Sequence, residues 1–232
     1  MTRRFAIYFA PPPGSELEAF GRRWLGRDHV TGEAVEREAI DGLNDSDQQR
    51  ISRSASHYGF HATLKAPFSL KEGRTGDELY EAANRFAHRR TAFEAPPLKL
   101  SKLSRWIALT LSAPSPEMNA LAEDCVRDFE PFRAKLSDDD VERRRKSGLT
   151  PRQDEQLLAF GYPHIFEDFH FHMTLAGPLE PAEKDMVFDR LRDRSDPLEQ
   201  GPLLVDAVAI YEQPDRDQPF TQTGRFPFQP KA

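Results

Sequence analysis

Histidine and threonine recur at the same spacing in two distant stretches of the chain. Both stretches, 58–68 and 169–179, read His-x-Thr-Leu-x-x-Pro followed by a large apolar residue, and His172 follows His61 by 111 residues. A single His-x-Thr would carry little weight in a chain of 232 residues. Two copies with shared flanks indicate an internal duplication.

These residue types fit the chemistry of phosphoesters. A neutral imidazole can take a proton from a hydroxyl or a water molecule, and a protonated imidazole can give one to a leaving oxygen. Histidine suits both tasks because its ordinary pKa lies near neutrality. Threonine hydroxyls can donate to non-bridging phosphate oxygens as charge moves onto them. We therefore predict a catalytic set of His61, His172, Thr63 and Thr174. This set needs neither a metal nor a cofactor, and the sequence has no obvious carboxylate cluster to hold a metal.

The two motifs must be strands for this chemistry to work. Alternate side chains of a strand point to opposite faces, so the imidazole and the hydroxyl of each copy would share one face and the apolar residues would take the other. Strict alternation adds Lys65 to the polar face of the first copy and His170 to that of the second. Two such strands brought together would line one groove.

The surrounding sequence predicts an α+β protein of alternating helices and strands. Alternation of apolar residues predicts strands at 3–10, 59–65, 93–103, 105–111, 203–212 and 220–228, besides the second motif. Helical spacing and capping residues predict helices after Ser15, near 45–54, at 75–90, after Ser115, after Ser137, after Thr150 and at about 181–194.

The same order of helix, strand and strand follows each motif. This repetition predicts one bilobal domain over residues 1–232, with lobes related by a pseudo-twofold axis. Residues 131–168 have no counterpart in the other half, so we expect a helical insertion there.

Three stretches carry a resemblance to a known superfamily: 5–11, 58–68, and 161–163 leading into 169–175. Together with the paired motifs they resemble the two-histidine (2H) phosphoesterases, a LigT-like superfamily that includes cyclic phosphodiesterases and RNA ligase-like proteins. Within it, the chain is similar to a branch found with bacterial phosphonate-utilisation genes. The resemblance implies two antiparallel sheets that frame a central cleft, with helices outside. It also implies that His61 and His172 are base and acid, in an order that depends on how the substrate lies.

Seven further side chains are candidates for substrate binding: Tyr8, Lys65, Trp106, Arg133, Arg143, Tyr162 and His170. Lys65 would neutralise phosphate charge if it faces the groove, although a lysine at a strand end is as often solvated. Tyr8 and Trp106 are placed toward the groove by alternation against the isoleucines beside them.

The remaining candidates lie in or beside the insertion and the second motif. Arg133, Arg143 and Tyr162 could cover the cleft, but a solvated helix face explains Arg143 equally well. His170-x-His172 could be half of a metal site. Because further ligands are missing from the sequence, an accessory role in the groove is the better interpretation of His170.

Composition limits the classes of molecule that the protein is expected to bind and the compartment in which it is expected to act. The net charge of −6 argues against a protein that neutralises many phosphates of a nucleic acid, so we expect a small phosphorylated substrate and no bulk nucleic-acid binding. A single cysteine, Cys125, allows no intrachain disulfide and suits a reducing compartment. Because no apolar run is long enough for a signal peptide or a membrane span, we expect a cytoplasmic protein without membrane contact.

The leading hypothesis is a metal-independent phosphodiesterase that hydrolyses a small, plausibly cyclic, phosphoester of a sugar or nucleotide. Two alternatives stay open at this point. One is an RNA end-processing enzyme acting on a 2′,3′-cyclic or 2′–5′ linkage, which the acidic net charge argues mildly against. The other is a module that binds a phosphorylated metabolite without turnover.

Overall fold

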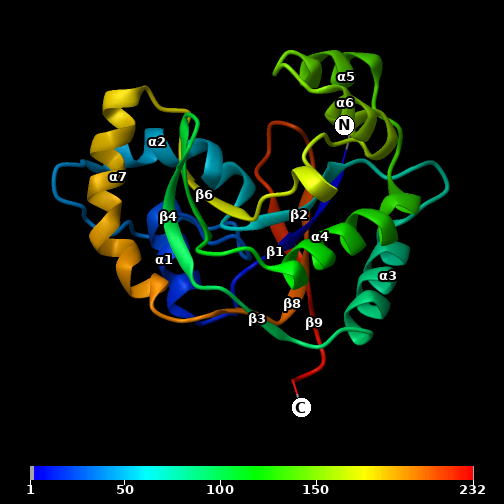
Figure 1. The fold of residues 1–232 in the computed structure, drawn as a ribbon, viewed down its shortest axis with the longest axis horizontal. Coiled ribbons are helices and arrows are strands. Elements are labelled where there is room, and N and C mark those ends of the chain that lie inside the picture. Colours follow the sequence, from blue (N-terminus) through cyan, green and yellow to red (C-terminus); the bar gives the residue numbers. More distant parts are fainter. Residues whose placement is uncertain (1–2, 232) are drawn as a thin grey trace.

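A computed structural model describes residues 3–231, and it is an α+β protein built around antiparallel strands (Figure 1). The predicted fold class is therefore confirmed. The strands are β1 (Arg4–Phe9), β2 (Ala62–Phe68), β3 (Phe93–Ala95), β4 (Leu98–Leu103), β5 (Trp106–Leu111), β6 (His172–Ala176), β7 (Leu203–Val205), β8 (Ala207–Gln213) and β9 (Thr221–Pro227).

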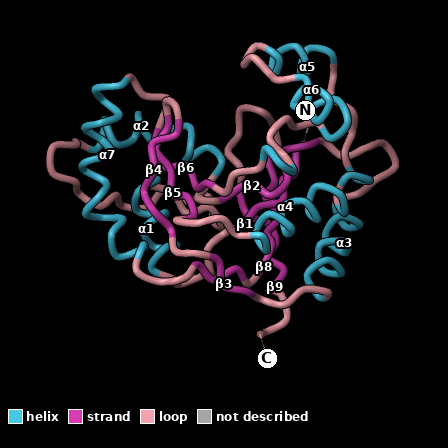
Figure 2. Tube along the Cα trace, in the orientation of Figure 1, coloured by secondary structure: helices cyan, strands magenta, loops and turns pink. Residues whose placement is uncertain are grey.

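Helices lie on the outside of these strands (Figure 2). They are α1 (Glu16–Leu25), α2 (Asp45–Tyr58), α3 (Gly76–His88), α4 (Pro116–Asp128), α5 (Asp138–Arg145), α6 (Pro151–Phe160) and α7 (Pro181–Ser195), with short 3₁₀ turns η1 (Glu130–Phe132), η2 (Phe166–Asp168) and η3 (Asp196–Glu199). The predicted caps Ser115 and Thr150 are confirmed, because each side chain accepts a hydrogen bond from the backbone N–H three residues ahead.

The strands of residues 3–231 form a seven-stranded sheet in the order β4-β5-β6-β2-β1-β8-β9 and a two-stranded sheet of β3 and β7. The two motif strands, β2 and β6, meet at the centre in the single antiparallel pair Ala62↔Met173. The two sheets that we expected are thus joined into one through a narrow contact.

That contact places the two His-x-Thr motifs in register with each other. Ala62 and Met173 are the middle residues of the two His-x-Thr motifs, so equivalent positions face each other across the pair. The hairpin of β4 and β5 follows the first motif in the sequence, yet it pairs with β6 of the second motif. The β8–β9 hairpin follows the second motif and pairs with β1, next to β2. Each hairpin therefore extends the part of the sheet that contains the other motif strand.

Two of the predicted strands are each broken in two. The strand expected at 93–103 is interrupted at Pro96-Pro97, and the strand expected at 203–212 is interrupted at Asp206. Proline has no N–H to donate to a strand ladder, which explains the first break. The short pieces left over, β3 and β7, pair with each other.

Helices cover the two halves of the sheet separately. The helices α1, α2 and α7 pack near β4, β5 and β6, whereas α3 and α4 pack against β2, β8 and β9 (Figure 1). Between helices and strands lies one large core of aromatic and aliphatic side chains, including Phe9, Trp24, Phe86 and Phe129. The insertion, with α5 and α6, leaves this core and lies beyond the end of the sheet (Figure 1). Among residues 3–231, no helix is both long and apolar enough to cross a membrane.

Candidate active site

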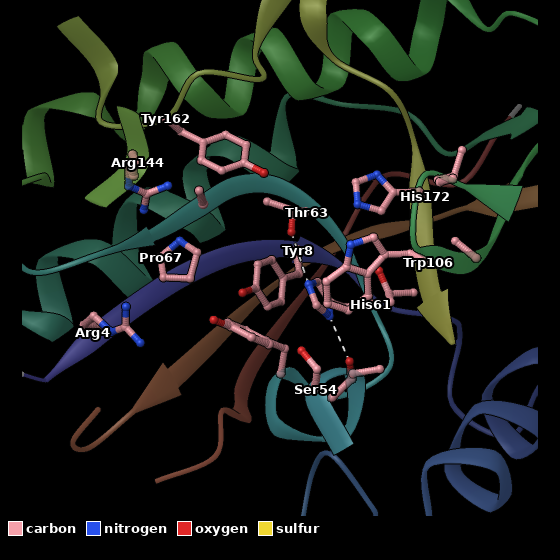
Figure 3. Close-up of a pocket in the computed structure, with 17 residues that line it drawn as sticks. Arg4, Tyr8, Ser54, His61, Thr63, Pro67, Trp106, Arg144, Tyr162 and His172 are labelled. Carbon is pink, nitrogen blue, oxygen red and sulfur yellow. Dashed lines mark hydrogen bonds between the residues drawn. The ribbon is translucent and has the colours of Figure 1, made fainter. Parts of the chain in front are cut away.

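The polar faces of β2 and β6 line a cavity of about 360 Å³ (Figure 3). All four residues of the predicted catalytic set border it: His61, Thr63, His172 and Thr174. The apolar residues between them, Ala62 and Met173, are buried on the other side. The structure thus brings the four side chains together, and their catalytic role stays a prediction.

The register explains why they converge. Because Ala62 pairs with Met173 in antiparallel strands, His61 lies across from Thr174 and Thr63 lies across from His172. Each imidazole therefore has the hydroxyl of its own strand and the hydroxyl of the other strand as neighbours. A pairing shifted by one residue would turn one set of side chains away from the cavity.

His61 is held by contacts on several sides. Its Nδ1 lies 2.8 Å from the carbonyl oxygen of Gly59, and since a carbonyl can only accept, Nδ1 must carry the proton. The neutral ring then has its lone pair on Nε2, which lies 3.2 Å from Thr63 Oγ1. The ring of Tyr8 stacks on the imidazole with centroids 3.7 Å apart. The basic nitrogen of His61 therefore faces the cavity.

Burial makes His61 a neutral group at pH 7. Loss of solvent, together with the nearby His172, lowers the pKa of His61 to about 3, against the opposing effect of the hydrogen bond to Gly59. A group with this pKa is unprotonated over the whole physiological range, and the low value also makes it a weak base.

His172 has the same backbone anchor in a more open setting. Its Nδ1 donates to the carbonyl oxygen of His170 at 2.8 Å, which again leaves Nε2 toward the cavity. Whereas Tyr8 stacks on His61, no aromatic ring of the described residues stacks on His172. The two histidines therefore have matching tautomers and different surroundings.

Three of the predicted substrate-binding residues, Tyr8, Trp106 and Tyr162, border the cavity. Tyr8 is fully buried behind His61, and its hydroxyl has no hydrogen-bond partner in the described part of the chain. Trp106 lies against Gly177, where an added Cβ would come within 2.7 Å of the indole, so glycine is needed for this approach. Tyr162 follows the left-handed Gly161 that ends α6 and brings the insertion to the cavity.

Lys65 does not face the cavity, which corrects our expectation. In the pairing of β1 with β2, Tyr8 faces Thr63 but Ile7 faces Lys65, so Leu64 is an extra residue in β2. This β-bulge breaks the alternation and turns Lys65 to the side of the sheet on which Ile7 is buried.

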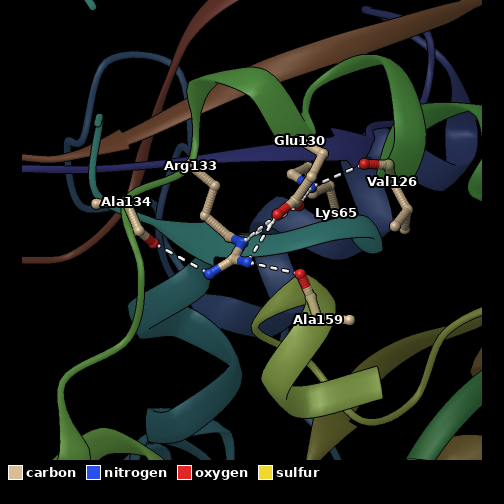
Figure 4. Close-up of polar contacts among 6 residues, drawn as sticks. All are labelled: Lys65, Val126, Glu130, Arg133, Ala134 and Ala159. Carbon is tan, nitrogen blue, oxygen red and sulfur yellow. Dashed lines mark hydrogen bonds and ion pairs between the residues drawn. The ribbon is translucent and has the colours of Figure 1, made fainter. Parts of the chain in front are cut away.

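Buried partners compensate the charge of Lys65 (Figure 4). Its Nζ donates to the carbonyl oxygen of Val126 at 2.9 Å and to Glu130 Oε2 at 2.8 Å. Arg133 binds the same carboxylate and also donates to the carbonyl oxygen of Ala159, in α6, at 2.9 Å. Arg133 is therefore another expected substrate contact that lies away from the cavity. It ties the insertion to the motif strand instead.

Arg143 and His170 also lie outside the cavity. Arg143 is exposed and pairs with Asp140 of its own helix. His170 is exposed as well, and its Nδ1 contacts the carbonyl oxygen of Asp168 at 3.1 Å. The alternation that predicted a cavity-facing His170 fails because β6 begins only at His172.

Two arginines that we did not predict border the cavity, Arg4 and Arg144. Alternation along β1 would have found Arg4, because it shares a face with Tyr8. No pattern distinguishes Arg144 from its two arginine neighbours in the sequence. Tyr58 and Ser54, from α2, complete this polar lining.

The charge in the cavity wall is one-sided. Its lining includes two arginines and two histidines and no aspartate or glutamate. Within residues 3–231, no three His, Cys, Asp or Glu side chains gather where they could hold a metal ion. This lining favours an anionic ligand and offers acid–base groups to it.

Two curated proteins that are similar in sequence to this chain carry the same name. The chain is 34% identical over 229 residues to "Ribose 1,5-bisphosphate phosphokinase PhnN" of Janthinobacterium sp. (strain Marseille), covering 97% of this chain and 51% of that protein. It is 28% identical to the protein of the same name from Laribacter hongkongensis (strain HLHK9), covering 94% of this chain and 50% of that protein. The chain thus spans about half the length of the curated relatives it matches.

Solved structures are more distant. A crystal structure of a phosphoesterase matches with a TM-score of 0.43 and 15% identity, covering 99% of both chains. A structure of E. coli LigT complexed with 3′-AMP matches with a TM-score of 0.44 and 15% identity, covering 98% of this chain and 99% of that one.

A protein-family model matches residues 63–221, which is more than half of the chain and includes all of β2 but its first residue, the insertion and β6. The chain belongs to the family described as "Protein of unknown function (DUF1045)".

Proposed function

We propose that this chain is a metal-independent phosphodiesterase that hydrolyses a small cyclic phosphoester. The observation that carries the proposal is the convergence of two histidines and two threonines in one cavity whose wall has arginines and no carboxylate. Phosphodiesters are anions, and their hydrolysis needs a proton acceptor, a proton donor and hydrogen bonds to the phosphate oxygens.

In the proposed reaction, His61 is the general base and His172 the general acid. His61 is neutral at pH 7 because its pKa is lowered to about 3, and its Nε2 is unprotonated because Nδ1 carries the ring proton. His172, as the general acid, gives a proton from Nε2, while its Nδ1 stays bound to the carbonyl oxygen of His170. The hydroxyls of Thr63 and Thr174 donate to the non-bridging oxygens.

The atoms balance as follows. A water molecule attacks phosphorus and loses a proton to Nε2 of His61, while a new P–O bond forms. The P–O bond to one ring oxygen breaks, and that oxygen takes the proton from Nε2 of His172. The products are a phosphomonoester and a free hydroxyl on the same molecule. One proton must then return from His61 to His172 through solvent before the next turnover.

The substrate that we propose is a cyclic phosphate on a ribose phosphate. The longer relatives carry the name of a kinase for ribose 1,5-bisphosphate, and this chain aligns with about half of each. Hydrolysis of the bond between phosphorus and O2 in the 1,2-cyclic phosphate of ribose 5-phosphate would yield ribose 1,5-bisphosphate. This compound appears in the name of that kinase. A role in phosphonate metabolism, suggested by the resemblance to the phosphonate-associated branch, is part of this proposal.

The first experiment is hydrolysis of ribose 1,2-cyclic phosphate 5-phosphate in the presence of a chelator. We expect turnover by the wild type, and a loss of about 10²-fold or more in kcat for His61→Ala and for His172→Ala, because each removes one acid–base group. His170→Ala, an exposed neighbour outside the cavity, is the matched control and should keep its activity.

Other results would contradict the proposal. Full dependence on added metal, or undiminished turnover by both histidine variants, would exclude the mechanism. Faster hydrolysis of a 2′,3′-cyclic oligoribonucleotide than of the sugar phosphate would favour RNA end processing. Tight binding of the sugar phosphate without any turnover would favour a binding module.

A further inference from the structure

We propose that Arg4 and Arg144 form a second anion-binding subsite, which holds a phosphate group of the substrate other than the one that reacts. The subsite makes the enzyme specific for doubly phosphorylated molecules. This inference rests on the proposed function, since it deepens the same cavity's choice of substrate.

Arg4 reaches the cavity from β1 with its charge uncompensated by an acid. Its Nε donates to Gln213 Oε1 at 2.7 Å, and Nη2 donates to the same oxygen. The pairing Arg4↔Gln213 between β1 and β8 fixes the stem of this side chain. Among the described residues, Arg4 has no ion pair with a carboxylate, and a neutral amide is its only hydrogen-bond acceptor.

Arg144 approaches the same end of the cavity from α5. Its guanidinium lies over the ring of Tyr162, with Cζ 5.4 Å from the centroid. Its Nε is buried and lacks a hydrogen-bond partner in the described part of the chain. A buried donor that lacks an acceptor costs free energy, and an anionic ligand would remove this cost.

Nearby acids are occupied elsewhere. Asp140, which lies in the same helix as Arg144, accepts hydrogen bonds from Arg143 and from Arg216, the latter at 3.0 Å. Burial lowers the pKa of both Arg4 and Arg144, as expected for cations with reduced solvation. Asp140 lies close enough to offset part of the lowering of both pKa values, but among the described residues it forms no ion pair with Arg4 or Arg144. The two arginines therefore keep donors free for an anionic ligand in this part of the cavity.

This place is separate from the reacting groups. Arg4 and Arg144 lie on one side of Pro67 in the cavity, whereas His61 and His172 lie on the other (Figure 3). Along β1, Arg4 and Tyr8 are four residues apart, about 13 Å at 3.3 Å per residue, and Tyr8 stacks on His61. A ligand that spans the cavity must carry negative charge at both ends to use both sets of side chains.

The test compares two substrates that differ only in the remote phosphate: ribose 1,2-cyclic phosphate with and without a 5-phosphate. We expect the wild type to prefer the 5-phosphorylated compound in kcat/KM. Arg144→Gln should lower kcat/KM for that compound at least about tenfold, the size of one charge-assisted hydrogen bond, and change the other compound less than about twofold. Arg144→Lys should recover part of the loss.

Arg145→Gln is the matched control, because Arg145 is adjacent to Arg144 in sequence, exposed, and paired with Asp154 away from the cavity. This variant should leave kcat/KM for both substrates unchanged. Equal losses on both substrates in Arg144→Gln, or no preference of the wild type for the 5-phosphate, would overturn the subsite.

Binding separates this inference from the proposed function. Calorimetry on His61→Asn, or on the wild type if it hydrolyses neither compound, should give an at least tenfold lower Kd with the 5-phosphate than without it. Arg144→Gln should abolish this difference. With that result the subsite stands even if turnover is absent. Equal Kd values of the wild type for the two compounds, or a difference that persists in Arg144→Gln, would overturn it.

Discussion

The two histidines of the cavity differ in what surrounds them, although their sequence motifs are nearly the same. Both donate from Nδ1 to a backbone carbonyl two residues back, so both direct Nε2 to the cavity. Only His61, which is half-buried, lies beneath a stacked tyrosine, because β1 runs beside β2 and brings Tyr8 over it. This asymmetry is the reason to assign the base role to His61.

The lowered pKa of His61 predicts the shape of the pH profile. Because His61 is protonated only below about pH 3, kcat/KM should show no acid limb between pH 5 and 7. Activity should instead fall at high pH, where the general acid loses its proton. The measurement is kcat/KM on the cyclic substrate from pH 4.5 to 9. An acid limb near pH 6.5 would contradict the assignment of His61 as the neutral base.

Thr63 allows a test of the hydroxyl without a change in shape. Thr63→Val keeps the branched side chain and removes the donor, so kcat should fall by about 10²-fold, as when one oxyanion donor is removed elsewhere. Thr63→Ser keeps the hydroxyl and should retain most of the activity. Similar kcat values for the valine and serine variants would show that the hydroxyl does not act on the phosphate.

At the scale of elements, one bulge in β2 separates the cavity from an internal ion network. The extra residue Leu64 leaves Thr63 on the cavity face and turns Lys65 to the interior, where the lysine side chain is only 4% exposed. Glu130 then binds Lys65 from one side and Arg133 from the other (Figure 4). Since Arg133 also holds the carbonyl of Ala159, the network links the motif strand to α6 and the insertion.

Removing the shared carboxylate should destabilise the protein. Glu130→Gln leaves Lys65 and Arg133 as buried cations without an acid, and breaking a buried ion pair costs about 3 kcal/mol. Urea unfolding should therefore show a lower free energy of unfolding for this variant. The control is Glu81→Gln, whose exposed pair with Arg85 at 3.5 Å should contribute much less. Equal losses in the two variants would show that the network contributes no more to stability than an exposed ion pair does.

At the scale of the whole molecule, two histidines whose pKa is lowered by loss of solvent make the stability depend on pH. Burial lowers the pKa of His29 to about 4 and that of His61 to about 3, from 6.5 in the unfolded chain. Between those values only the unfolded state binds the protons. Stability is therefore complete above pH 6.5 and falls as the pH drops toward 4, by about 1.4 kcal/mol per unit for each histidine.

Urea unfolding at pH 7, 6 and 5 measures this slope. His29→Gln should make the slope shallower, because one histidine with a strongly lowered pKa no longer titrates. His88→Gln, on the exposed end of α3, should leave the slope unchanged. A free energy of unfolding that does not change between pH 7 and 5 would contradict the buried neutral state of both histidines.

Local pattern was enough to predict the class of the fold and the centre of the site. Helix caps such as Ser115 and Thr150 act on their own first turn, and the His-x-Thr repeat needs only strand alternation to place imidazole and hydroxyl on one face. These features depend on residues a few positions apart. They can therefore be read without knowing which strand pairs with which.

Two features of the cavity depend on contacts between distant elements, and periodicity could not predict them. Lys65 turns inward because β1 and β2 pair with a bulge. Arg144 rather than Arg143 enters the cavity because of the way in which the insertion packs beside Tyr162. Register and packing between distant elements decide which side chains line the cavity. The spacing of nearby residues in the sequence does not contain this information.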